Sequence, residues 1–159
     1  MKKKLNLFAT FGFLGVLFTI AAFLFPIGTG VVWATAQAGN SYNAGYDFVF
    51  GNDASQIVAS GYYICAFSLL IIAVVFQILG TVFTLPNPDA SHKFSGFLHL
   101  VSAIALVVVA LFFFLGAKLT PTPNESYVPS LGYGFIAAGA AAAASAVSSL
   151  TTFLVSLKK

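Results

Sequence analysis

The chain has 159 residues, which fits one domain, and its formal net charge is +3. Hydrophobic residues make up 59% of it and charged residues only 7%, whereas a soluble domain carries roughly 25% charged residues. So few charges cannot cover a water-exposed surface, and the composition therefore excludes a soluble globular protein. The basic residues are all Lys and lie mostly at the chain ends, which argues against nucleic-acid binding, because nucleic-acid binders gather basic residues on one face.

Four apolar segments are long enough to cross a bilayer, whose hydrocarbon core of about 30 Å needs about 20 helical residues. Pro26 and Pro86 stop the first two segments, and lysines bracket the third. Each segment is far longer than the roughly 10 residues of a barrel strand. The sequence therefore predicts an all-α membrane protein, a single four-helix transmembrane bundle over residues 1–159. The predicted helices cover residues 5–25, 61–85, 94–117 and 133–157.

The N-terminus also resembles a secretory signal peptide, with three lysines, an apolar run and small residues near Ala34. The apolar run from Leu5 to Phe25 is longer than the roughly 7–15 residues of a typical signal core. We therefore expect an uncleaved first helix.

The distribution of lysines predicts the orientation of the helices. One side of the predicted bundle carries six of them: Lys2, Lys3, Lys4, Lys93, Lys158 and Lys159. The other side carries only Lys118. By the positive-inside rule, both termini and the 86–93 turn are cytoplasmic and loops 27–60 and 119–132 are external. This describes a multi-pass protein of the cell membrane, and the MKKKL start is typical of bacteria.

The first outer loop, residues 27–60, is longer than a connection needs, and long loops are usually functional or disordered. Two short runs in it, Val31–Thr35 and Tyr46–Phe50, have β character, with turn residues between them. Two interpretations remain open: a small β-hairpin, or an irregular loop whose aromatics rest on the membrane interface. The candidate interaction residues of this loop are Trp33, Tyr46, Asp47, Phe48 and Phe50.

Polar residues within the predicted spans gather in the cytoplasmic half, and an intramembrane ionisable residue is a functional candidate. If residues 85 and 94 lie at equal depth on an antiparallel hairpin, Gln77 lies beside Ser102 and His99 beside Gly80. We expect an interhelical hydrogen-bonded clasp, with His99 bonded to Thr84, to Gln77 or to the backbone near Gly80. The alternative is a solute or proton path. The predicted clasp consists of Gln77, Thr84, His99 and Ser102.

Small residues predict how the helices pack, because helices in lipid associate through close backbone approach. Heptad-spaced seams on the second and third helices, Ala66–Ala73–Gly80 and Ala103–Ala110–Ala117, are expected to face each other. The Ala-rich fourth helix is expected to pack on the first helix, near Gly12 and Gly15, rather than on another subunit.

The chain carries no recognisable catalytic motif, so we expect no enzymatic activity. The single cysteine, Cys65, lies in an apolar run and excludes an intrachain disulfide. The few His and Cys residues do not form a metal-binding pattern. The sequence therefore predicts no cofactor and no metal.

Four spans, inner termini and a long first outer loop with a Trp resemble the claudin-like four-span plan. Trp33 stands without that family's GLW motif and paired outer cysteines, so the resemblance concerns architecture and assigns no residue a role. The predicted function is a non-enzymatic scaffold or accessory subunit that presents the first outer loop. The alternative is a small oligomeric channel or transporter. The expected partners are the lipid bilayer and other membrane subunits or further copies of the chain.

Overall fold

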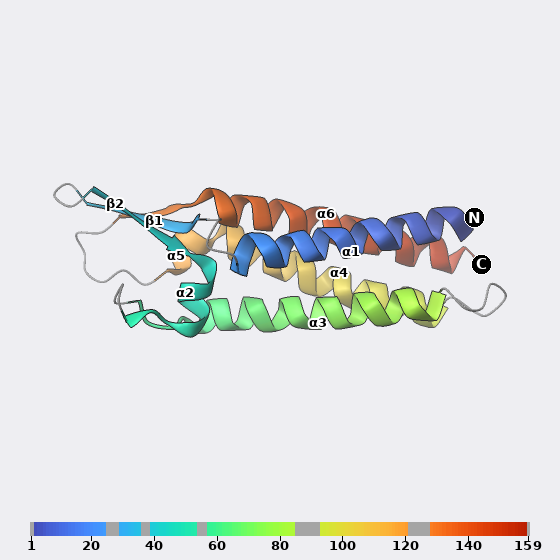
Figure 1. Ribbon diagram of the computed structural model, residues 1–159. Coiled ribbons are helices and arrows are strands. Elements are labelled where there is room, and N and C mark those ends of the chain that lie inside the picture. The colour runs from blue at the N-terminus through green and yellow to red at the C-terminus, as the bar shows by residue number, and fades with distance from the viewer. Residues whose placement is uncertain are drawn as a thin grey trace.

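The computed structural model describes residues 2–24, 29–35, 39–53, 57–84, 93–120 and 128–158. Within these ranges the chain is mostly helical, and four long helices lie side by side (Figure 1). They are α1 (Lys2–Leu24), α3 (Gly61–Thr84), α4 (Lys93–Phe114) and α6 (Tyr133–Leu157). Helix α1 begins and α6 ends at the same end, which we call the terminal end. The opposite end carries the strands and is called the cap end.

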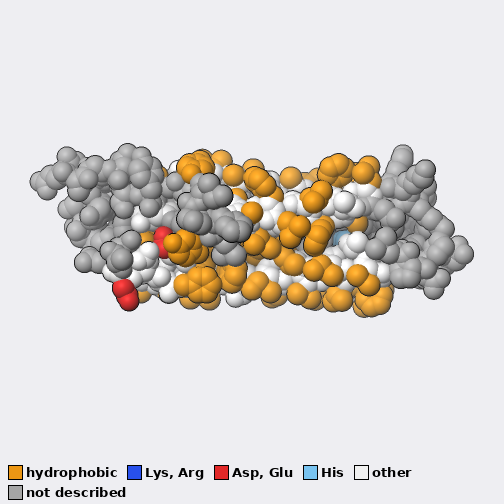
Figure 2. Space-filling model, viewed as in Figure 1, with side chains coloured by type: hydrophobic (Ala, Val, Ile, Leu, Met, Phe, Trp, Pro, Cys, Tyr) orange, Lys and Arg blue, Asp and Glu red, His pale blue; other side chains and the backbone are white. Residues whose placement is uncertain are grey.

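Three of these helices are long and apolar enough to cross a membrane, namely α3 over Gly61–Phe83, α4 and α6. The described apolar part of α1, Leu7–Phe23, is shorter. Exposed hydrophobic side chains cover the middle of the molecule, and the acidic side chains in view lie at the cap end (Figure 2). The predicted helical class is confirmed in this coarser form: the described chain is mostly helical, and three of its helices are long and apolar enough to cross a membrane.

The long helices form a ring in which α6 contacts α1 and α4, and α3 contacts α4 and, less extensively, α1. Glycines permit the closest approach, because a Cβ added at Gly15 would lie only 2.9 Å from the Cβ of Ser145. The expected packing of the fourth long helix on the first is confirmed.

The expected contact between two alanine seams is only half correct. On α3, Ala66 and Ala73 are buried, and the carbonyl oxygen of Ala73 meets Ser102 of α4. On α4, however, Ala103 and Ala110 line a groove between α4 and α6. Small residues identify a face that allows close approach, but α4 has two neighbours, and the spacing alone does not say which of them the face meets.

Helix α4 ends at Phe114, three residues before its predicted end at Ala117, and a short helix α5 (Gly116–Leu119) follows. The hydroxyl of Tyr63 donates a 2.8 Å hydrogen bond to the carbonyl oxygen of Gly116. A Cβ at Gly116 would lie 2.7 Å from the ring of Phe135. The chain therefore turns out of α4 at Gly116, where the Tyr63 hydroxyl bonds to the backbone and the absence of a side chain leaves room for the ring of Phe135.

The cap combines both outer segments. Strand β1 (Thr29–Thr35) pairs antiparallel with β2 (Gly39–Ala44) and with β3 (Val128–Leu131), which gives the sheet order β2-β1-β3. Strand β3 comes from the second outer segment, and the sequence pattern did not indicate it.

The second predicted strand of the first loop, Tyr46–Phe50, is wrong, because this segment lies in helix α2 (Gly45–Phe50). Gly45 packs so closely on Phe23 that a Cβ there would overlap the ring. At the other end Gly51 has a φ of 79°, and its N–H donates to the carbonyl oxygen of Asp47 at 2.9 Å. A left-handed glycine of this kind is a common helix stop. The alternating aromatics indicated a strand. Instead, the close packing of Gly45 and the left-handed conformation of Gly51 favour the short helix α2.

Candidate functional site

Gln77 lies at the centre of the ring of helices, on α3, and its side chain has no exposed surface. Its Oε1 accepts a 2.7 Å hydrogen bond from Ser102 of α4 and a 2.9 Å bond from Ser149 of α6. The hydroxyl of Ser102 also lies 3.1 Å from the carbonyl oxygen of Ala73. One amide side chain therefore links three helices.

Helix α1 completes the same layer through Gly12. A Cβ at Gly12 would overlap Nε2 of Gln77, so the amide tip lies directly against the α1 backbone. Ser145 of α6 donates to the carbonyl oxygen of Gly12, and Ser148 donates to that of Phe8 at 2.6 Å. We call Gly12, Gln77, Ser102, Ser145 and Ser149 the Gln77 cluster.

The predicted register between the second and third spans is confirmed by these contacts. Gln77 is bonded to Ser102, and the ring tip of His99 lies against Gly80, where an added Cβ would be 2.9 Å from Nε2. In the same layer Ser95 donates a 2.7 Å hydrogen bond to the carbonyl oxygen of Gly80.

The hydrogen bond expected of His99 is absent from the described part of the structure. His99 is fully buried, and within that part neither ring nitrogen has a partner. The expected bonds to Gln77 and to the backbone near Gly80 are therefore wrong, because the ring tip meets the Cα side of Gly80 while Ser95 occupies its carbonyl oxygen. The third expected partner, the Thr84 side chain, lies outside the described residues.

The Gln77 cluster is uncharged, and its chemistry is that of hydroxyls, one amide and backbone carbonyl groups. The two described carboxylates, Asp47 and Asp53, belong to the cap at the other end of the bundle. Among the residues with described side chains, no three His, Cys, Asp or Glu groups gather in a way that could hold a metal ion. The geometry is suited to fixing four helices against each other.

A cluster of aromatic rings occupies the core at the cap end. Phe135 of α6 lies at its centre, with ring centroids 5.2 Å from Tyr63, 5.4 Å from Phe113 and 5.9 Å from Phe23. Phe48 of α2 joins through Tyr63, at 5.2 Å. We call Phe23, Phe48, Tyr63, Phe113 and Phe135 the aromatic cluster. All five side chains are fully buried, so the cap and the bundle share one core.

The candidate interaction residues of the first outer loop separate into different environments. Phe48 belongs to the aromatic cluster, and Asp47 is buried and accepts a 2.9 Å hydrogen bond from Nδ2 of Asn52. Tyr46 is half-buried, and Phe50 is exposed. Trp33 lies in β1 opposite Ser41 and Pro129, but its side chain lies outside the described residues. Asp47 and Phe48 are therefore part of the core of the cap and are not exposed to a binding partner.

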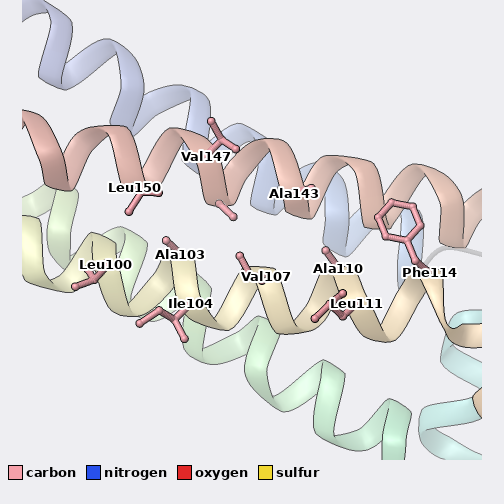
Figure 3. Close-up of a pocket in the computed structure, with 11 residues that line it drawn as sticks. Leu100, Ala103, Ile104, Val107, Ala110, Leu111, Phe114, Ala143, Val147 and Leu150 are labelled. Atoms are coloured by element: carbon pink, nitrogen blue, oxygen red, sulfur yellow. The ribbon is translucent and has the colours of Figure 1, made fainter.

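A groove of about 420 Å³ runs between α4 and α6 (Figure 3). Its lining comes from α4 between Leu100 and Phe114 and from α6 between Ala143 and Leu150, and every lining residue is apolar. No lining side chain offers a hydrogen bond, so nothing in the groove would orient a polar ligand.

Ser149, Ser145 and Gly12 belong to the Gln77 cluster but not to the predicted clasp. They lie on helices that no short turn joins to α3 and α4, so hairpin register could not place them. Their sequence signal was weak: serines within an Ala-rich span and a glycine within an apolar one. No model of a known protein family matches the chain, and no curated protein shows significant similarity to it.

Proposed function

We propose that the chain is a four-span protein of the cell membrane, without enzymatic activity, that acts as a scaffold or accessory subunit and presents its folded cap to a partner. Both termini lie in the cytoplasm in this proposal, because six of the seven lysines flank that side. Helix α1 supplies the fourth span, since it has 23 residues and packs along α6 for much of the length of the ring.

The observation that carries the proposal is the way the cap is fixed to the bundle. Strand β1 joins segments from both outer loops into one sheet, and the aromatic cluster continues from α2 into α3, α4 and α6. A surface held in this manner keeps one shape and one orientation relative to the membrane. Preorganised surfaces of this kind lose less entropy on binding a partner than mobile loops do.

The burial of the polar residues argues against the alternative of an oligomeric pore. Such a pore would need Gln77 and His99 on the surface where subunits meet, but neither side chain has exposed surface within one chain. Within one chain, the buried rings of the aromatic cluster fill the core at the cap end. These features support a scaffold over a channel or transporter.

Photocrosslinking from the cap in intact cells tests the function directly. A photoreactive residue at Ser130, whose side chain is exposed on β3, should yield a defined adduct with a specific membrane or extracellular protein. The same residue at lipid-exposed Ile104 is the matched control. Adducts that are identical from both positions, or none from Ser130 in native membranes, would count against presentation by the cap.

Cysteine labelling tests the topology separately. In a Cys65→Ser background, cysteine at Ser41 should react with a membrane-impermeant maleimide in intact cells, and cysteine at Ser91 should react only after the cells are opened. The reverse pattern would overturn the orientation without touching the proposed role of the cap.

A further inference from the structure

The corner between α2 and α3, together with the first turn of α3, exposes three large apolar side chains. Phe50 is 67% exposed, Val58 76% and Tyr62 53%. The residues next to them point the other way, since Val49 and Ile57 are buried in the core. The corner therefore has apolar side chains on its exposed side as well as on the side that faces the core. A loop surrounded by water would carry polar side chains on its exposed side. We call Phe50, Val58 and Tyr62 the corner patch.

The position of Phe50 along the bundle follows from its contact with α3. Its ring meets the ring of Phe67 edge-on, with centroids 6.0 Å apart. Phe67 lies six residues beyond Gly61, the first residue of an apolar helix long enough to span a membrane, and a helix rises 1.5 Å per residue. Phe50 therefore lies beside α3 roughly 9 Å inside the start of that span, between the levels of the exposed Ile64 and Ile71.

Backbone contacts fix the position of the corner relative to α3. The N–H of Ser60 donates a 2.7 Å hydrogen bond to the carbonyl oxygen of Phe48, and Asn52 and Ile57 exchange two backbone hydrogen bonds of 2.9 and 3.0 Å. Helix α2 crosses the end of the bundle instead of extending it (Figure 1). Through the Phe50 ring beside Phe67, and through Tyr62, which is itself part of α3, the patch adjoins the exposed apolar surface of that helix.

We propose that the corner patch inserts into the outer leaflet, with Tyr62 near the boundary between headgroups and acyl chains and Phe50 deeper among the acyl chains, and that α2 lies in the plane of the membrane. Phospholipid is the occupant that fits, because the patch continues a surface that already faces acyl chains. Tyr is moreover enriched at the headgroup boundary, and amphipathic segments lie in the interface with the apolar face buried. The exposed carboxylate of Asp53 then points to water. This inference rests on the proposed membrane placement of the bundle.

Spin-label accessibility tests the insertion. The full-length protein is reconstituted into vesicles of phosphatidylcholine and phosphatidylglycerol, and a nitroxide is attached at Phe50→Cys or Val58→Cys in a Cys65→Ser background. Collision rates with oxygen, which concentrates in lipid, are compared with those of a water-soluble nickel chelate. The ratio of oxygen to nickel collisions should be several times larger at both positions than at Asp53→Cys.

The native Cys65, which is exposed on α3, provides the control for the bundle itself. A lipid-like ratio at Cys65 with a water-like ratio at Phe50 would overturn the inference while leaving the membrane placement intact. A water-like ratio at Cys65 would overturn the membrane placement as well. A nickel-accessible Val58 beside a lipid-accessible Phe50 would also contradict the insertion of the whole patch.

Discussion

Near the terminal end the core of the bundle contains an amide, an imidazole and several hydroxyls, whereas near the cap end it contains the five rings of the aromatic cluster. Interhelical hydrogen bonds in membranes contribute on average only about 0.6 kcal/mol, but they require particular atoms to meet. Buried rings contribute through many contacts at once and tolerate several geometries. We therefore expect the Gln77 cluster to fix the register of the helices and the aromatic cluster to supply most of the stability.

Phe135→Ala should have the largest effect, a loss of about 3–5 kcal/mol in the free energy of unfolding, because it empties the centre of the aromatic cluster. The measurement is reversible unfolding in bicelles. Phe97→Ala is the matched control, since Phe97 is 55% exposed on α4 and its loss leaves no cavity. Equal losses at the two positions would remove the distinction between the two ends of the bundle.

Gly12→Ala should cost about 1–3 kcal/mol, because its Cβ would overlap Nε2 of Gln77 and force the cluster to shift. The penalty should largely disappear in a Gln77→Ala background, where that tip is missing. Gly61→Ala serves as the control, since a Cβ there meets nothing within 4 Å. If Gly12→Ala lowers the free energy of unfolding by the same amount in the Gln77→Ala background, the added Cβ clashes with a residue other than Gln77.

His99→Leu should raise the free energy of unfolding by about 1 kcal/mol, because the buried imidazole has no hydrogen-bond partner among the described residues and an apolar replacement removes the cost of burying it unpaired. Gln77→Leu should instead lower it, since the hydroxyls of Ser102 and Ser149 would lose their shared acceptor. Both are measured in the same unfolding assay. A clear loss with His99→Leu would mean that the imidazole has a partner after all.

Ser149→Ala should have the smallest effect, about 0.6 kcal/mol, the average for one interhelical hydrogen bond in a membrane. A double-mutant cycle with Gln77→Ala isolates the pair from other changes. Ser68→Ala is the control, because among the described residues the Ser68 hydroxyl donates within its own helix, to the carbonyl oxygen of Ile64. A coupling energy near zero would leave Ser149 with a packing role only.

The sequence predicted the long helices well, because each is an uninterrupted apolar run with a clear stop. It also predicted the Gln77–Ser102 pair, since a tight connection fixes which residues of two neighbouring helices lie level. It could not predict that Ser149 and Gly12 contact Gln77, because no local constraint relates the facing sides of α6 and α1 to that hairpin. Two expected partners of His99, Gln77 and the backbone near Gly80, were wrong for a related reason: the register determined the depth of His99 but not the direction of its ring.

The cap was predicted less well, and each failure has a local cause. Alternating aromatics favoured a strand at Tyr46–Phe50, but helix α2 is determined by the close packing of Gly45 on Phe23 and by the left-handed Gly51. Strand β3 has four residues and includes Pro129, so its pattern is too short to be recognised. Its pairing with β1 is a contact between distant parts of the chain, which no sequence window contains.

That pairing sets the order in which the molecule can be completed. Val31 in β1 lies opposite Leu131 in β3, and chains are synthesised from the N-terminus. Strand β1 must therefore wait until α3, α4 and β3 have been synthesised before it can pair with its second neighbour. A conformation-specific antibody against the three-stranded sheet would consequently count only finished molecules and ignore those stalled during biogenesis.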